Sequence, residues 1–207
     1  VLTRLGETAR AETALRQSVE LAQRLGIAAH EQLMATSYLT FNLSSQGRVE
    51  EARQLIEGAL WAFTGSPDTY EAFQCQSVMA DVALEKYQLS RAENLFDTLL
   101  QTGKRRQFNI PLGMVHFGLA YIHLVTGRAE SGLSHARAAL ALLERTRAIQ
   151  LFLDQGERTK VVCNALAGAG EDSPFLQRVR ELLPGKRQKL VAVAVTQSTI
   201  VVKCLGN

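Results

Sequence analysis

Gly47-Arg48-Val49-Glu50-Glu51-Ala52 and Gly127-Arg128-Ala129-Glu130-Ser131-Gly132 are two copies of one phrase in a chain of 207 residues. A related phrase begins at Gly6, and another begins at Tyr87, which takes the place of glycine. With these residues as position zero, the copies are spaced by 41, 40 and 40 residues by subtraction. A fixed period of this length is typical of stacked helical repeats.

The residues that follow each position zero have the period of one helical face. A small residue stands five positions on, a bulky apolar residue nine positions on in three copies, and another apolar residue thirteen positions on. The sets are Ala11, Ala52, Ala92 and Gly132, then Leu15, Ile56 and Phe96 with Ala136 in the fourth copy, then Val19, Leu60, Leu100 and Leu140. Steps of four residues place these side chains on one side of a helix, which we call helix B.

A second helix, helix A, precedes the turn in each complete unit. A large apolar residue lies eight positions before zero, at Leu39, Met79 and Leu119. A small residue lies next to it, at Thr40, Ala80 and Ala120. The small residue allows the paired helix to approach closely, and the large one fills the space beside it. The unit is therefore helix A, a short turn and helix B.

The pattern predicts helices over 7–25, 29–46, 48–64, 68–86, 89–102, 110–126, 128–146 and 156–168, and a last helix that ends near 183. Ser66-Pro67-Asp68 and Asp172-Ser173-Pro174 indicate helix starts, because Ser and Asp cap helices and proline fits the first turn. We expect Trp61, late in one helix B, to wedge between two units.

This register resembles the tetratricopeptide (TPR) motif over roughly residues 1–147, through the large-small pair on helix A, the turn glycine and the alanine on helix B. It departs from the motif at Tyr87 and at the tryptophan-like position of helix A, which is Thr36, Gln76 and His116. The resemblance implies an all-α fold, a TPR-like helical-hairpin solenoid with a right-handed superhelix. We expect this domain over 1–185, and over 186–207 a basic linker with an apolar tail that is a strand or unstructured.

The phrase Phe152-Leu153-Asp154-Gln155-Gly156, followed later by Ser173-Pro174-Phe175, resembles the end of the sensor region in MalT-type transcription regulators, which are ATP-dependent bacterial proteins of the LuxR family. The resemblance implies a sensor domain that couples effector binding to self-association. The chain itself has no GxxxxGK[ST] phosphate loop. The alternative is a TPR adaptor module that binds a peptide or partner protein and has no role in transcription.

In the TPR register, helix A residues at 13, 10, 6 and 3 positions before zero line the concave side of the stack. The ligand- or partner-binding groove is predicted at Met34, Ser37, Phe41, Gln74, Ser77, Asp81, Met114, Phe117 and Tyr121. Methionine and aromatic side chains beside hydroxyls suit a small-molecule inducer or a regulatory protein or peptide. Because the first unit lacks its helix A, we also expect a homodimer.

The sequence gives little sign of catalysis, and we expect no enzyme, no metal site and no cofactor. His116 and His123 are seven residues apart and lack a close third ligand, so a packing role is favoured. Asp81 and Glu85, one turn apart, could work as acid and base, but such pairs usually form a solvated helix face.

Composition and charge bear on the partners and the compartment that we expect for the protein. The formal charge of +3 and the lack of a basic recognition helix give no reason to expect direct contact with nucleic acid. Cys75, Cys163 and Cys204 are scattered, which favours a reducing compartment, so we expect a cytoplasmic protein. No apolar run is long enough to cross a membrane, and we expect no secretory signal, because Val1-Leu2-Thr3-Arg4 runs straight into a polar helical pattern.

Overall fold

A computed structural model describes residues 7–63, 65–66 and 68–183, and this part of the chain is helical without any strand. The expected basic linker and apolar tail over 186–207, which include Cys204, lie outside the described residues. The helices are α1 Thr8–Arg24, α2 Ala29–Ser45, α3 Val49–Ala62, α4 Tyr70–Glu85, α5 Leu89–Arg106, α6 Asn109–Val125, α7 Ala129–Arg145, α8 Ile149–Leu153, α9 Glu157–Gly168 and α10 Pro174–Leu182. The even-numbered helices α2, α4 and α6 are the A helices, and α1, α3, α5 and α7 are the B helices.

The small residues of the repeat lie in the hairpin interfaces, as the register predicts. Ala52, Ala80, Ala92 and Ala120 have no exposed surface. Thr40 is equally buried at the small position of α2, and its hydroxyl donates a hydrogen bond to the carbonyl of Thr36 at 2.9 Å. A threonine is tolerated there because its one polar group is satisfied within the helix.

Each hairpin turn closes with the same backbone geometry. Gly47, Tyr87 and Gly127 have φ of 77°, 55° and 80°, the left-handed region that glycine enters without steric cost. The amide of the next residue then bonds five residues back, from Arg48 to Leu43, from Gln88 to Ala83 and from Arg128 to His123. This pattern satisfies the last carbonyls of helix A and fixes the angle at which helix B leaves. Tyr87 adopts the geometry despite its side chain.

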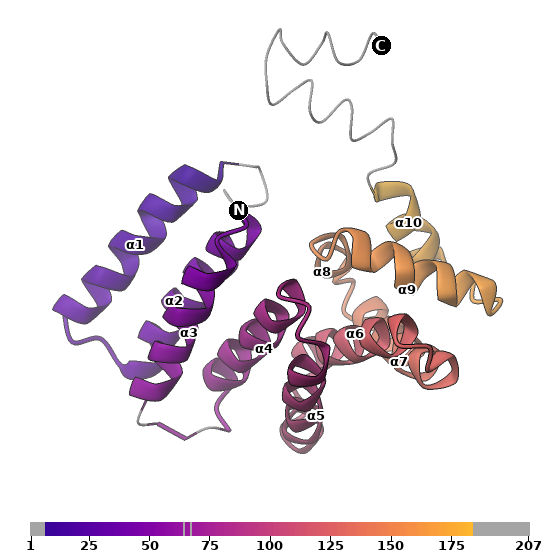
Figure 1. Cartoon of the computed structure of the whole chain (residues 1–207), viewed down its shortest axis with the longest axis horizontal. Helices are drawn as coiled ribbons and strands as arrows, with labels where there is room; N and C mark the ends of the chain where they lie inside the picture. Colours follow the sequence, from indigo (N-terminus) through magenta and orange to yellow (C-terminus); the bar gives the residue numbers. More distant parts are fainter. Residues whose placement is uncertain (1–6, 64, 67, 184–207) are drawn as a thin grey trace, which may run out of the picture.

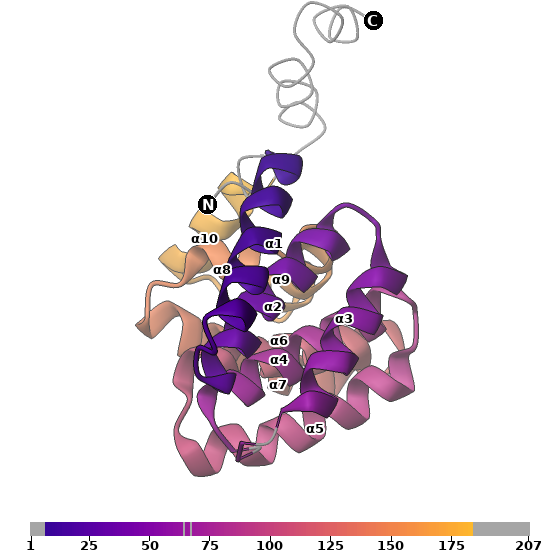
Figure 2. The same ribbon diagram turned by 90° about the vertical axis from the view of Figure 1, so that its left-hand side faces the viewer.

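The helices follow one another around an arc, with α1–α3 at one end and α8–α10 at the other (Figure 1). The view in Figure 2 shows α1 as the outermost helix of its end, with α2 and α3 behind it. The helix α8 lies on the inner side of the arc, facing α4. The last helices pack on the α6–α7 hairpin, where Phe152 contacts Phe117 with ring centroids 5.2 Å apart.

A series of ion pairs, which we call the ladder, joins successive units. Its pairs link residues 34 to 37 positions apart, close to one repeat. The members are Arg16 with Glu51, Arg48 with Glu12, Lys86 with Glu50, Arg91 with Glu57, Arg105 with Asp68, Arg128 with Glu93 and Arg137 with Glu171. The charges therefore recur with the period of the fold.

Three local expectations need correction. The short helix α8 was not predicted, because its five residues are too few to show a period. The cap of α4 is Thr69, whose hydroxyl accepts from the amide of Ala72, so the helix begins after the predicted Ser66–Asp68 signal. Trp61 does not wedge between units, since 90% of its surface is exposed near the end of α3. By contrast, Ser173 caps α10 with Pro174 in its first turn, as predicted.

Candidate functional site

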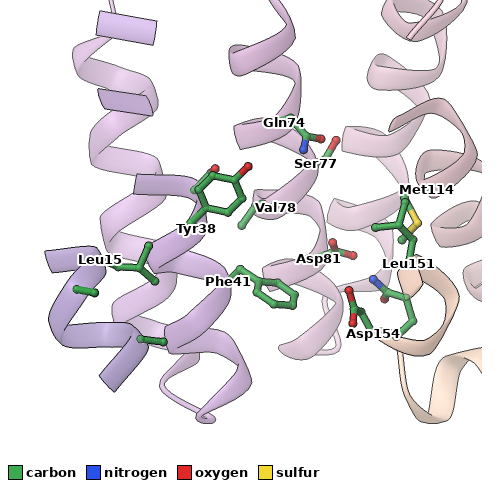
Figure 3. A pocket seen from close by; sticks show the side chains of 14 residues that line it. Leu15, Tyr38, Phe41, Gln74, Ser77, Val78, Asp81, Met114, Leu151 and Asp154 are labelled. Atoms are coloured by element: carbon green, nitrogen blue, oxygen red, sulfur yellow. The ribbon is translucent and has the colours of Figure 1, made fainter. Parts of the chain in front are cut away.

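A groove of about 570 Å³ runs along the inner side of the arc (Figure 3). Its floor is α4, one wall comes from α1 and α2, and the other comes from α6 and the α8–α9 turn. A smaller hollow of about 260 Å³ adjoins it and shares Phe41, Val78, Asp81, Asp154 and Gln155. The groove thus crosses several repeats.

Most residues predicted to face the concave side do line the groove. Those that line it are Ser37, Phe41, Gln74, Ser77, Asp81 and Met114. They come from α2, α4 and α6 at equivalent register positions, which is why three helices present them to one space. Their role in binding is tested by no contact in the structure and remains a prediction.

Phe117 and Tyr121 differ from the expectation because the last helices cover the concave face of α6. Phe117 is only 1% exposed and lies in the core with Phe152. Tyr121 packs against the same core, with the guanidinium of Arg158 6.0 Å from its ring centroid. Met34 is half-buried and lies outside the groove lining. Met34, Phe117 and Tyr121 therefore do not line the groove.

Several lining residues were not predicted. Tyr38 and Val78 stand nine positions before zero, one residue along from the positions that the register assigns to the concave side. Leu151, Asp154 and Gln155 belong to the α8–α9 segment, which has no counterpart in the repeat. The positions of Tyr38 and Val78 could have been predicted from the period of helix A. Those of Leu151, Asp154 and Gln155 depend on how the chain folds back after α7.

Asp81 is the ionisable group at the centre of the groove floor (Figure 3). Burial between the helices raises its pKa to about 6, an effect that Arg158 opposes and Glu85 reinforces. Asp81 still keeps 37% of its side-chain surface open, so the desolvation comes from the surrounding walls and not from full enclosure. A carboxylate in this position is a costly charge unless a cation joins it.

Arg158, in the first turn of α9, reaches across the inner side to α4. It forms an ion pair with Glu85, and its other guanidinium nitrogen lies 3.4 Å from Asp81 Oδ1 and donates to Gln155 at 2.9 Å. The partners on α4 lie 73 and 77 residues earlier in the chain. We call this contact the inner bridge. It makes Asp81 and Glu85 a binding pair for a cation, which their one-turn spacing alone did not reveal.

No protein-family model matches the chain, and no curated protein sequence matches it. Solved structures do share its fold. BtubC from P. vanneervenii is 18% identical with a TM-score of 0.58, over 96% of this chain and 84% of that one. A kinesin light chain-like protein from Podosopora anserina with nearly identical TPR-like repeats is 17% identical with a TM-score of 0.58, over 96% of this chain and 92% of that one.

A variant of the Podosopora anserina protein gives the same identity and score over 95% of this chain and 91% of that one. At such low identity the likeness shows the fold alone. The fold is a TPR-like helical repeat, as predicted. None of these structures is described as a transcription regulator, so the resemblance to MalT-type proteins gains no support from them.

Three histidines meet outside the groove, in the seam between α6 and α7. The Nδ1 atoms of His116 and His135 are 2.9 Å apart, and the ring of His123 lies 5.1 Å from that of His135. Burial lowers the pKa of both His116, to about 4, and His135. Their neutral forms are therefore favoured, which fits the packing role predicted for His116.

The contact of His135 with His116 runs across a hairpin, so the spacing of histidines in the sequence does not reveal it. His123 is also held, by Ser131 and by Glu93 of α5. In the described part of the chain, no three histidine, cysteine, aspartate or glutamate side chains are arranged to hold a metal ion. Burial raises the pKa of the Cys75 thiol to about 12 and of Cys163 to about 11, so neither is a ready nucleophile. Over the same residues, no helix has the length and apolar character to span a membrane.

Proposed function

We propose that this chain is a protein-interaction module that binds an extended segment of a partner polypeptide along the inner groove. The observation that carries the proposal is the groove itself, which crosses three A helices and combines apolar walls with a polar floor. Stacked hairpins create long concave surfaces of this kind, and such surfaces suit a chain laid across several units.

The polar groups of the floor are placed for a peptide backbone. The Gln74 amide faces the groove (Figure 3) and makes no hydrogen bond within the described residues, so its donor and acceptor are open to a ligand. The Ser77 hydroxyl donates to the carbonyl of Phe73 at 3.0 Å and keeps its oxygen as an acceptor. Phe41, Val78 and Met114 supply apolar contact beside these groups.

Nothing in the groove favours catalysis over binding. The acids of the groove lining are engaged with Arg158 or with amide side chains. None of the described cysteines and histidines lines the groove. We therefore propose a non-enzymatic module, and we place it in the cytoplasm on the ground that its buried thiols suit a reducing compartment.

A second proposal keeps the sensor role in a MalT-type regulator, with a small-molecule inducer or regulatory protein and a homodimer. One observation favours it. The phrase Phe152–Gly156 lies at the α8–α9 turn and puts Asp154 and Gln155 in the groove wall. The full reading frame tests it, since a phosphate-loop domain before this chain and a helix-turn-helix after it are required. A full frame lacking both contradicts it.

Selection from a random-peptide library displayed on phage tests the main proposal. We expect enriched peptides whose binding falls by about tenfold in Phe41→Ala, because an exposed aromatic wall of the groove is lost. Trp61→Ala is the matched control, since Trp61 is an exposed aromatic residue outside the groove. Equal binding to both variants would place the peptides elsewhere, and the absence of any enriched peptide would contradict the proposal.

A further inference from the structure

Exposed aromatic rings continue the groove towards the start of α4. Tyr38 and Phe41 of α2 line the groove, and their rings extend towards α4 (Figure 3). Tyr70 is the first residue of α4 and stands one turn before Gln74, so it shares the face of α4 that forms the groove floor. All three rings are exposed. The groove and the start of α4 therefore form one surface with aromatic side chains from two neighbouring A helices.

Tyr70 is supported from behind by the core, and it lies beside Tyr38. Its ring makes a T-shaped contact with Phe108 at 5.5 Å between centroids, and Phe108 packs in the same way on the buried Phe73. Partial burial raises the pKa of the Tyr70 phenol, and the neighbouring Tyr38 adds to this effect. The two tyrosines therefore form a pair across the junction of α2 and α4, and the core fixes one of them.

The hydrogen-bonding groups of this surface are open. Within the described residues, the hydroxyls of Tyr38 and Tyr70 and the side-chain amide of Gln74 make no hydrogen bond. The hydroxyl of Ser77, by contrast, already donates to a backbone carbonyl of its own helix. A ligand that lies on the rings is therefore offered O–H and N–H donors by side chains that are not otherwise engaged.

A proline-rich segment matches these features better than an ordinary extended chain does. Each ordinary residue brings an N–H group that needs an acceptor when it is buried against aromatic rings. Proline has no N–H, keeps its carbonyl as an acceptor, and offers an apolar ring that packs on aromatic faces. In the polyproline II helix the carbonyls make no internal hydrogen bonds, and the conformation is largely formed before binding, which lowers the entropy cost of binding.

We propose that the groove binds a proline-rich partner segment in the polyproline II conformation. This inference rests on the proposed function and names the chemical class of the partner. The proline rings pack on Tyr38, Phe41 and Tyr70. The carbonyls of the segment accept hydrogen bonds from the two tyrosine hydroxyls and from the amide of Gln74. Exposed rings that stand beside free donors commit the surface to this occupant.

The peptide selection described above, analysed by composition, tests this inference. We expect the enriched peptides to carry several prolines. A synthetic peptide of a selected sequence should bind about tenfold more tightly than its counterpart with alanine at every proline, because alanine adds N–H groups and makes the free peptide more disordered. Fluorescence anisotropy with the unaltered protein measures both affinities, so the comparison does not depend on the folding of a variant. Peptides that need Phe41 but bind equally well after the change to alanine would overturn this inference and leave the proposed function standing.

Tyr38→Phe then removes one donor and keeps the ring. We expect it to weaken binding of the proline-rich peptide by about fivefold, as the loss of one neutral hydrogen bond requires. Tyr87→Phe is the matched control, because Tyr87 is an exposed tyrosine at a hairpin turn outside the groove. Equal binding to the two variants would overturn this inference, since the open donors are what select the segment. Failure to select any peptide would contradict the proposed function itself.

Discussion

The ladder and the inner bridge are both made of ion pairs, yet they differ in the sequence separation that they span and in the burial of their cations. Ladder pairs join residues about one repeat apart, and their cations keep 29–60% of their side-chain surface exposed, whereas the acids Glu12 and Glu93 keep only 16% and 22%. The inner bridge joins residues 73 and 77 apart through Arg158, which is only 14% exposed. The ladder follows from the period of the repeat, whereas the bridge exists because the last helices fold back over the groove.

This difference teaches where specificity can arise in a repeat protein. Neighbouring units contact one another in the same way along the stack, so their contacts set the stability and curvature of the array. The contact of α9 with α4 breaks that equivalence and creates one place with its own electrostatics. In this chain that place is the groove floor at Asp81, where Arg158 of α9 reaches α4.

The largest expected effect comes from removing the core that seats the last helices. Phe152 is fully buried against Phe117 and Phe175, and Phe152→Ala should lower the free energy of unfolding by about 3–5 kcal/mol in urea titrations. Phe96→Ala, in the α4–α6 core, should cost a similar amount and serves as the matched variant. A loss below about 1 kcal/mol in Phe152→Ala would mean that the last helices are not seated on α6.

The next effect concerns the histidine seam between α6 and α7, which is a contact within one repeat hairpin. The pKa of His116 and of His135 is lowered in the folded protein, so the unfolded chain binds more protons at mildly acidic pH. Stability should therefore be complete above the unfolded pKa of about 6.5 and fall by roughly 1–3 kcal/mol as the pH drops towards 4.

Thermal unfolding measured across this pH range checks the histidine prediction. His116→Gln should flatten the acidic limb, because the amide cannot take up the proton. The matched control is His30→Gln, since His30 is exposed and outside the seam. The charged groups that face the two rings are Lys104, Asp97 and Glu93, and His123 lies beside His135. An acidic limb that His116→Gln leaves unaltered would assign the pH dependence to other groups.

A smaller effect should follow from breaking the inner bridge. Arg158→Gln leaves Asp81 and Glu85 without their shared cation and should cost about 1–2 kcal/mol of unfolding free energy. Stability that stays unchanged in Arg158→Gln would show that the bridge has no energetic role.

The smallest effect should follow from breaking one ladder pair. Arg91→Gln removes the partner of Glu57 and should cost no more than about 0.5 kcal/mol, because the two side chains are 43% and 30% exposed and such pairs are screened by water and salt. High salt should remove what difference remains. A cost equal to that of Arg158→Gln, measured in the same urea series, would abolish the distinction between ladder and bridge.

The sequence predicted the hairpins because each of them rests on local periodicity. Ala52, Ala92 and Ala120 occupy the interfaces that their spacing assigned, and the predicted ends of most helices agree with the structure to within a few residues. The groove was predicted in its middle, at Phe41, Ser77 and Asp81, for the same reason.

The ends of the groove could not be predicted in this way. Phe117 and Tyr121 stand at concave register positions, but the α8–α9 segment covers them, and no period describes that segment. The pairing of Arg158 with Asp81 joins residues 77 apart, and nothing near either residue announces it. Sequence patterns thus predict the contacts between neighbouring units, but they do not predict the contact between α9 and α4.

The ladder also carries a consequence for the order of the units. Ten positions after zero the residue is Arg16 in the first unit and Glu57 in the second, and each meets the opposite charge four positions after the next zero, at Glu51 and Arg91. The polarity of this pair reverses from one junction to the next. A stack that skipped the second unit would bring Arg16 against Arg91, so like charges would oppose the wrong neighbour. The charges of the ladder therefore help to specify which hairpin follows which.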